Sequence, residues 1–112
     1  MDTTEFKGLL EERRREIQDA IRRKRQEGLQ AEKAADPIDN LILIHGRESA
    51  VLDIERDRKK LQAAVDALER IESGTYGICE VCDEQIPERR LQIVPDASLC
   101  TRCAEEAERL AA

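Results

Sequence analysis

The chain has 112 residues, of which 39% are charged and only 2% aromatic, and its formal net charge is −6. This length allows one domain, or one small domain with an extended element. So few aromatic residues exclude a large globular core, whereas a sequence rich in Glu, Arg, Lys, Ala and Leu favours long solvent-exposed helices.

The same numbers restrict where the protein works and what it contacts. The longest apolar run, residues 41–44, is far shorter than the roughly 20 residues of a membrane span. The chain opens without an apolar signal segment, so we expect a cytoplasmic protein that does not contact a membrane. The acidic net charge argues against general nucleic-acid binding, which is typical of basic proteins with a high pI.

A first helix is predicted from Asp2 onward, because Asp2 and Glu5 have the spacing of a capping box. About thirty residues at 1.5 Å each would form a helix on the order of 45 Å long. Apolar residues recur along it at steps of three and four, which predicts one apolar stripe on a charged helix. The stripe consists of Phe6, Leu9, Leu10, Ile17, Ala20 and Ile21.

A basic run lies on this predicted helix. It comprises residues 13–15 and 22–25 and is interrupted by Glu16 and Asp19. The simpler interpretation is a solvated helix face with internal ion pairs. The alternative is contact with an acidic partner surface.

Pro37 ends the first helix and fits the first turn of a second one. The second helix carries a heptad-like seam and should be closed by Gly74 in the left-handed conformation. Two helices of similar length joined by a short turn most simply form an antiparallel coiled-coil hairpin. The predicted seam consists of Ile44, Arg47, Val51, Ile54, Arg58, Leu61, Val65 and Leu68.

All four cysteines of the chain fall into two Cys-x-x-Cys pairs, Cys79 with Cys82 and Cys100 with Cys103. The seventeen residues between the pairs give the spacing of a four-cysteine structural zinc site. Two disulfides would need an oxidising compartment, and a thioredoxin-like redox pair would need a βαβ pattern that is absent. Four thiolates leave no open coordination position, so the Zn²⁺ would support folding and would not activate water.

The fold class expected is mainly α: an antiparallel helical hairpin with a small four-cysteine zinc module and a short C-terminal helix. We expect the hairpin to span residues 1–73, with its tip at about residues 35–41, and the zinc module with the terminal helix to span residues 74–112. Within the module, residues 86–91 should contain a turn with a short helical piece, and residues 104–112 a helix. Few larger apolar residues are available there, so metal would contribute much of the folding energy. They are Tyr76, Ile78, Val81, Ile86, Leu91, Ile93, Val94 and Leu99.

The cysteine region resembles the zinc-finger signature of the DksA/TraR family, and the order of elements is similar over nearly the whole chain. The residues that carry the resemblance, at the family's mutual spacings, are Tyr76, Gly77, Cys79, Cys82, Ile86, Arg90, Leu91, Pro95, Cys100 and Cys103.

The resemblance implies a transcription regulator that binds RNA polymerase, not an enzyme. In this family the coiled coil enters the polymerase secondary channel, and two aspartates at its tip modulate initiation. The matching residues here are Asp36 and Asp39, on either side of Pro37, while Leu41 replaces the family's alanine. Residues 56–61 resemble the ppGpp-binding region only in composition, so ppGpp binding stays open. A monomer without sequence-specific DNA binding is expected.

Two other functions stay open. A nucleic-acid-binding zinc ribbon would need Lys, Arg and aromatic residues around the cysteines, where Glu80, Asp83, Glu84 and Glu105 stand instead. A coiled-coil adaptor without a polymerase role is the other alternative. Catalysis is not expected, because His45 is the only histidine and no nucleophile–base pair is suggested around it.

Overall fold

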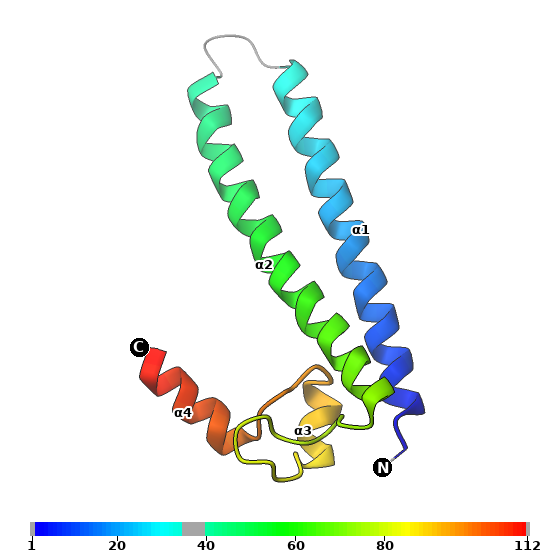
Figure 1. Cartoon of the computed structure of the whole chain (residues 1–112). Helices are drawn as coiled ribbons and strands as arrows, with labels where there is room; N and C mark the ends of the chain where they lie inside the picture. The colour runs from blue at the N-terminus through cyan, green and yellow to red at the C-terminus, as the bar shows by residue number, and fades with distance from the viewer. Residues whose placement is uncertain (1, 35–39, 112) are drawn as a thin grey trace. The chain divides into compact units, whose positions relative to one another are not determined.

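A computed structural model of the chain describes the backbone of residues 2–34 and 40–111, and the side chains of residues 2–28 and 50–111. Four helices follow one another: α1 (Thr4–Ala34), α2 (Asn40–Ser73), α3 (Glu88–Ile93) and α4 (Thr101–Ala111) (Figure 1). Within the described ranges, the only β-type pairing is an isolated antiparallel bridge between Ile78 and Gln85. The predicted mainly helical fold class is confirmed.

Packing divides the chain into two compact units. The first unit combines residues 1–13 with residues 63–112, and the second is formed by residues 14–62. Each unit contains a stretch of α1 and an antiparallel stretch of α2. The expected division after Ser73 is a division along the sequence and stays a prediction.

Helix α1 begins where the sequence predicts it. The Asp2 carboxylate accepts a hydrogen bond from the backbone N–H of Thr4 at 2.9 Å, which satisfies one of the free donors of the first turn. Of the predicted apolar stripe, Phe6, Leu10 and Ile21 are buried. The prediction for Leu9 is wrong, because its side chain is 44% exposed.

The predicted seam of α2 is partly wrong. Val51 is 53% exposed and Arg58 is also exposed, whereas Ala64 and Ala67 are fully covered. Helix α2 thus turns two alanines toward the cluster that contains Phe6 and Leu10 of α1. Small residues opposite large ones allow two helices to approach closely, and a search for large apolar residues overlooks them.

Ile54, Leu61, Val65 and Leu68 are partly buried, as residues at the edge of a helix contact are. The side chains of Ile44 and Arg47, also predicted for this seam, lie outside the described residues.

Gly74 ends α2 as predicted, with a φ of 78°. The N–H of Gly74 donates to the carbonyl of Ile71, and the N–H of Thr75 donates to the carbonyl of Arg70 at 2.9 Å. These two hydrogen bonds form a Schellman motif, which a residue with positive φ makes possible. The cap directs the chain out of α2 into the cysteine region.

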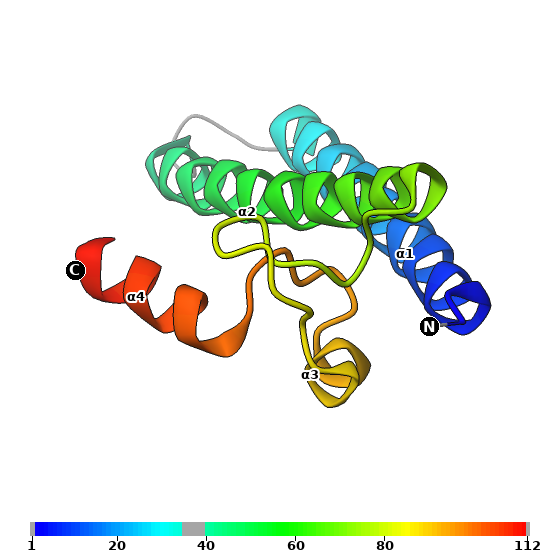
Figure 2. The same cartoon turned by 60° about the horizontal axis from the view of Figure 1, so that its bottom comes forward.

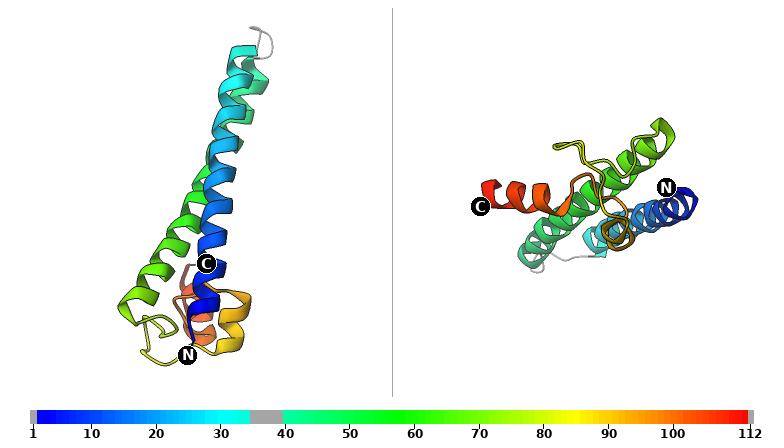
Figure 3. Two further views of the ribbon diagram at one scale, coloured as in Figure 1. Left: turned by 90° about the vertical axis from the view of Figure 1, so that its right-hand side faces the viewer. Right: turned by 90° about the horizontal axis from the view of Figure 1, so that it is seen from below.

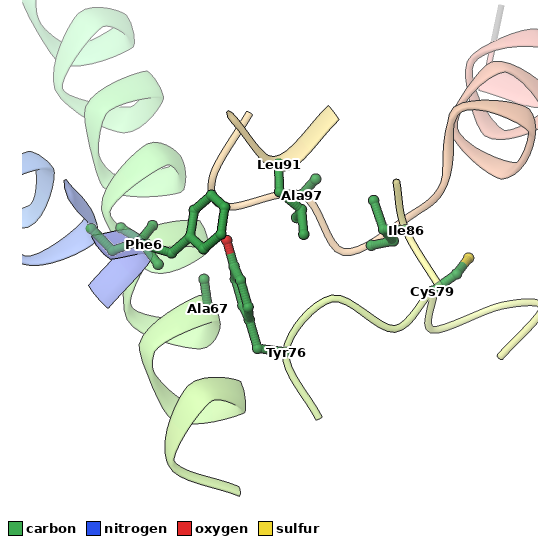
Figure 4. Close-up of a cluster of buried hydrophobic side chains, with 9 residues drawn as sticks. Phe6, Ala67, Tyr76, Cys79, Ile86, Leu91 and Ala97 are labelled. Atoms are coloured by element: carbon green, nitrogen blue, oxygen red, sulfur yellow. The ribbon is translucent and has the colours of Figure 1, made fainter. Parts of the chain in front are cut away.

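The first unit has a mixed core that joins the two long helices to the cysteine region. The rings of Phe6 and Tyr76 lie 5.6 Å apart, and Leu91 of α3 and Ile86 are almost completely buried in the same cluster (Figure 4). Figure 2 shows α3 beside the loops that follow α2, and α4 leading away from them. One aromatic pair and a few aliphatic residues are therefore enough to anchor α3.

Three of the larger apolar residues noted in the cysteine region do not join this core. Ile78, Val81 and Ile93 are exposed, the last at 74%. The short helical piece expected within residues 86–91 is α3, which begins at Glu88 and continues to Ile93, two residues past that range. Helix α4 begins at Thr101, three residues before the predicted start.

In the second unit, side chains are described for residues 14–28 and 50–62, and few of them are buried. Ile21 is its only buried apolar residue among the side chains described. Lys24 of α1 reaches α2 through two ion pairs, with Asp57 at 2.6 Å and with Asp53 at 3.2 Å. Figure 3 shows α1 and α2 in two further views. Among residues 2–34 and 40–111, no helix combines the length and apolar character that a membrane span requires.

Candidate metal centre

The first cysteine pair lies in a tight loop between Gly77 and Ile86. The N–H of Ile86 donates to the carbonyl of Gly77 at 2.7 Å, and the N–H of Cys79 donates to the carbonyl of Glu84 at 2.8 Å. Gly77 and Asp83 both have positive φ, 84° and 59°. Aspartate tolerates this region better than most residues, so the chain can reverse within the loop and present both sulfurs on one side.

The second pair lies at the start of α4. The N–H of Ala104 donates to the carbonyl of Cys100 at 2.9 Å, so that Cys103 lies in the first turn of the helix. The N–H of Glu80 donates to the carbonyl of Ser98 at 3.0 Å, which joins the first loop to the segment before Cys100. Backbone hydrogen bonds thus place the two pairs against each other.

The four sulfur atoms converge. All Sγ atoms of Cys79, Cys82, Cys100 and Cys103 lie within 4.8 Å of one another, and none forms a disulfide. The Cys82 and Cys100 sulfurs are 3.8 Å apart. A tetrahedron with metal–sulfur bonds of about 2.3 Å has edges of about 3.8 Å, so this spacing fits a zinc shell and is far too long for a disulfide.

The surroundings of the four sulfurs shift the pKa values of the thiols in opposite directions. Hydrogen bonding from the backbone N–H of Cys82, and next from that of Cys100, lowers the pKa of the Cys79 thiol to about 6. Contact with the Cys100 sulfur is the main cause that raises the pKa of Cys103 to about 12. Four thiolates at this distance repel one another, and a divalent cation that accepts sulfur ligands is what would stabilise them together. The donor set therefore fits Zn²⁺.

Arg70, near the end of α2, contacts both halves of the cysteine region. Its guanidinium lies 3.5 Å from the carbonyl oxygens of Asp96 and Ala97 and 3.7 Å from the Glu80 carboxylate. The Arg70 side chain is only 13% exposed. One planar cation with several donors can link groups that come from different segments, which suits arginine better than lysine.

Two further contacts fix the segment between Pro95 and Leu99. The Tyr76 hydroxyl donates to the carbonyl of Pro95 at 2.7 Å, and Arg90 Nε donates to the carbonyl of Leu99 at 3.0 Å. Burial is the main cause that raises the pKa of Tyr76 to about 12, so the hydroxyl keeps its proton and remains a donor. The segment that precedes Cys100 is therefore positioned from both sides.

The sequence analysis did not identify Arg70 or the ion pair between Arg13 and Asp96, whose N–O distance is 3.2 Å. Asp96 lies 83 residues after Arg13, and no local pattern indicates a contact at that separation. A basic residue in the last turn of α2 was a weak signal for Arg70, because cations are favoured there.

The predicted tip residues are not among the described ones. Asp36 and Asp39 lie outside the described residues, as does the side chain of Leu41. The described ends of the helices that flank them are Ala34 and Asn40.

Comparison with known proteins identifies the family. Residues 74–109 match the sequence model of the prokaryotic dksA/traR C4-type zinc finger, a stretch that includes all four cysteines. An uncharacterized protein of Aquifex aeolicus is 63% identical over 43 residues, but this match spans only 38% of the chain and 30% of that relative.

The similarity to other proteins extends beyond the cysteine region. The RNA polymerase-binding transcription factor DksA of Salmonella typhimurium is 31% identical over 105 residues, which cover 92% of the chain and 69% of that protein. Transcription factor DksA2 from Pseudomonas aeruginosa has a similar structure, with a TM-score of 0.86 at 33% identity over 95% of the chain and 82% of that structure. Since both the helices and the cysteine module are matched, the chain belongs to the dksA/traR C4-type zinc-finger family.

Proposed function

We propose that this protein binds RNA polymerase and regulates transcription initiation. The observation that carries the proposal is the similarity over 92% of the chain to a protein named as an RNA polymerase-binding transcription factor. A similarity limited to the cysteines would support only a zinc finger. Here the similarity also covers the two long helices, which a nucleic-acid-binding zinc ribbon does not need.

In this proposal Cys79, Cys82, Cys100 and Cys103 hold one Zn²⁺ with a structural role. The convergence of the four sulfurs supports this assignment. When bound, the ion would cross-link the loop after α2 to the start of α4. A shell of four thiolates has no position for water or substrate, which supports a regulator without catalytic activity.

Helices α1 and α2 would act as the arm that carries residues 35–41 into the secondary channel of the polymerase. Helix α1 alone has 31 residues, or about 45 Å at 1.5 Å per residue, which is long enough to reach an active centre below the protein surface. Asp36 and Asp39 would be the contact residues, because two carboxylates on a proline-containing turn can approach cationic side chains or bound Mg²⁺.

The test compares polymerase binding with the lifetime of promoter complexes. The wild type and Asp36→Asn/Asp39→Asn are each tested for co-purification with core RNA polymerase. The decay of open complexes is then measured with each protein, using RNA polymerase holoenzyme on promoter DNA. We expect the variant to bind within about threefold of the wild type, since most of the arm is intact, but to lose the effect on open-complex lifetime.

A matched control is Glu12→Gln/Glu16→Gln, which removes the same charge from exposed positions on α1. It should behave as the wild type in both measurements. Absence of polymerase binding by the wild type would contradict the proposal and favour an adaptor role. Tight binding to bare DNA that weakens steeply with salt would favour a nucleic-acid-binding ribbon.

A further inference from the structure

Residues 95–99, which lead directly into Cys100, form neither a helix nor a strand. Each of their five backbone carbonyl groups nevertheless lies 2.7 to 3.5 Å from a donor that belongs to another segment. An irregular segment whose acceptors all have partners can keep one defined shape. In chain order, the donors are the Tyr76 hydroxyl, the Arg70 guanidinium for two successive carbonyls, the Glu80 N–H and Arg90 Nε.

Arg70 differs from the other donors because it extends from α2 and contacts both halves of the metal site. Its Nη2 atom lies 3.5 Å from the carbonyl oxygens of Asp96 and Ala97, which precede the second cysteine pair. Its Nη1 atom lies 3.7 Å from the carboxylate of Glu80, a residue of the first pair's loop. One rigid, planar group therefore connects the two cysteine pairs to each other and to the helix.

The backbone of Arg70 is itself fixed by the end of α2. Its carbonyl accepts hydrogen bonds from the N–H groups of Thr75 at 2.9 Å and Tyr76 at 3.1 Å, so the turn that leaves the helix closes on this residue. The Arg70 side chain is only 13% exposed, which restricts the positions that its guanidinium can take. The guanidinium therefore extends from a fixed point toward the cysteine region.

A four-cysteine site depends on such contacts because its ligands come from two separate segments. All four sulfurs must reach about 2.3 Å from one ion at the same time, and closing the chain between the two pairs costs conformational entropy. Residues that orient ligands without touching the metal typically change metal affinity by about 10- to 100-fold. A side chain that contacts both segments in the closed arrangement offsets part of this cost.

We propose that Arg70 is a positioning residue for the metal site. By anchoring both cysteine pairs to the end of α2, it increases the affinity for Zn²⁺ and slows release of the ion. The inference rests on the proposed binding of Zn²⁺ by the four cysteines, and it extends that assignment to a residue of the long helix. The competing explanation is that Arg70 only stabilises the last turn of α2, where a cation is favoured.

The two explanations require different chemistry from residue 70. The last turn of a helix needs only a positive charge, which lysine also supplies. Contact with two carbonyls and a carboxylate at once needs the planar fork of arginine, which a compact ammonium group cannot replace. Arg70→Met removes both properties, whereas Arg70→Lys removes only the fork.

The experiment measures metal affinity and metal release with the full chain. Metal-free protein is titrated with Co²⁺, followed by the thiolate-to-metal absorption, and Zn²⁺ competition gives the zinc affinity. Release is followed as transfer of Zn²⁺ from the loaded chain to an excess of a chromogenic chelator. We expect Arg70→Met to bind Zn²⁺ about tenfold more weakly and to release it about tenfold faster. Arg70→Lys should lose about threefold, because the fork is absent.

Thermal unfolding of the metal-free chain, followed by circular dichroism, separates positioning from helix stability. Arg70→Lys keeps the charge at the end of α2, so its metal-free form should melt with the wild type while its zinc affinity is lower. At saturating Co²⁺, all variants should show the absorption of a tetrahedral four-thiolate site, because none of them removes a sulfur.

Two further variants test which contacts matter. The control Arg89→Met removes the same charge from an exposed position on α3 and should change zinc affinity by less than about twofold. Glu80→Gln removes only the link to the first pair. Because the Glu80 side chain is 58% exposed, this surface change leaves the fold intact. It should weaken zinc binding by about two- to threefold, and should add nothing to Arg70→Met.

Three results would overturn the inference: equal zinc affinity of Arg70→Met and the wild type, full recovery in Arg70→Lys, or an equal loss in Arg89→Met. The second would assign Arg70 to the helix end, and the third to general attraction between cations and thiolates. A wild type that binds no metal would overturn the zinc assignment as well, so the two failures are distinguishable. Polymerase is absent from the assay, so its outcome is independent of the test of transcription regulation.

Discussion

Residues 1–13 and 63–112 bury an aromatic pair, several aliphatic side chains and a cysteine, whereas residues 14–62 bury Ile21 and connect their two helices through Lys24. Both units use the same two helices, so the difference does not come from secondary structure. It comes from what lies between the helices. Among the side chains described, the first unit combines a packed core with a set of metal ligands, whereas residues 14–28 and 50–62 are joined mainly by charged contacts.

The contrast indicates how the two units divide their tasks. A unit stabilised by a core and a cross-link has one preferred structure. Between residues 14–28 and residues 50–62, the described side chains bury little apolar area, so this stretch gains little stability from packing and leaves its faces available for contact. The first unit is therefore suited to form a rigid part of the protein, and the second to offer its surface to a partner.

Metal removal should give the largest effect. Structural zinc contributes about 10–16 kcal/mol of apparent folding free energy in small zinc domains, so chelation should unfold residues 74–111. Amide hydrogen exchange should accelerate for Cys79, Ile86 and Val94, whose N–H groups are bonded in the present structure. The amides of residues 14–28 and 50–62 should change much less.

The companion variant is Cys82→Ser, which removes one sulfur with little change in volume. Zinc content, measured by native mass spectrometry, should fall in this variant. Unchanged thermal stability and amide exchange after complete removal of the metal would show that the core alone specifies the first unit. The metal ligands would then not contribute to the difference between the two units.

Tyr76→Phe should give an intermediate effect and tests the core apart from the metal. The change removes the hydroxyl that donates to Pro95 and leaves a buried carbonyl without its partner. We expect a loss of about 1–2 kcal/mol in the free energy of unfolding, measured with denaturant on the zinc-loaded protein. Bound zinc should remain at the level of the wild type.

The pH dependence provides a second readout of the same variant. Because burial raises the pKa of Tyr76 from 10.0 to about 12, the folded state binds this proton more tightly than the unfolded state. The resulting stabilisation is complete below pH 10 and is lost as the pH rises through 12. Tyr76→Phe lacks this titration, so its stability should decline less than that of the wild type over this range. Parallel curves would contradict the assignment.

Lys24→Met should give the smallest effect and tests the second unit. It removes the ion pairs with Asp53 and Asp57 while keeping most of the aliphatic stem. The urea midpoint should decrease slightly, and the difference from the wild type should shrink at high salt because the Lys24 and Asp53 side chains are partly exposed. The control Lys7→Met changes an exposed lysine and should leave the midpoint unchanged.

A large loss of helix in Lys24→Met would show that a single charged contact holds the second unit together. No change at all would show that the helices of this unit are held by continuity with the first unit alone.

The parts of the structure that follow from local rules could be predicted. The spacing of the cysteines indicated their convergence, and two successive long helices were expected and are found as α1 and α2. Gly74 was identified as a cap because a residue in the left-handed region closes a Schellman motif. The positions of Phe6 and Leu10 in the core followed from helical periodicity. Each of these features depends on residues that are close in the sequence.

The features that the sequence did not reveal depend on contacts between distant segments. Ala64 and Ala67 are buried because they lie in one cluster with Phe6 and Leu10 of α1, whereas Val51 lies outside this cluster and is exposed. Arg70 and Asp96 acquire their partners only when the loops of the cysteine region fold back on α2. The heptad pattern placed both Val51 and Arg58 in the helix contact, because it contains no information on which side chains of α1 lie opposite them.

The chain contains one tyrosine and no tryptophan, and that tyrosine lies where α1, α2 and the cysteine region meet. Its ring contacts Phe6 and its hydroxyl is bonded to the segment that leads to Cys100. The intrinsic ultraviolet emission of the unlabelled protein therefore comes from a single fluorophore at this junction. Loading of the metal and attachment of the module to the long helices can thus be followed in real time, without a dye.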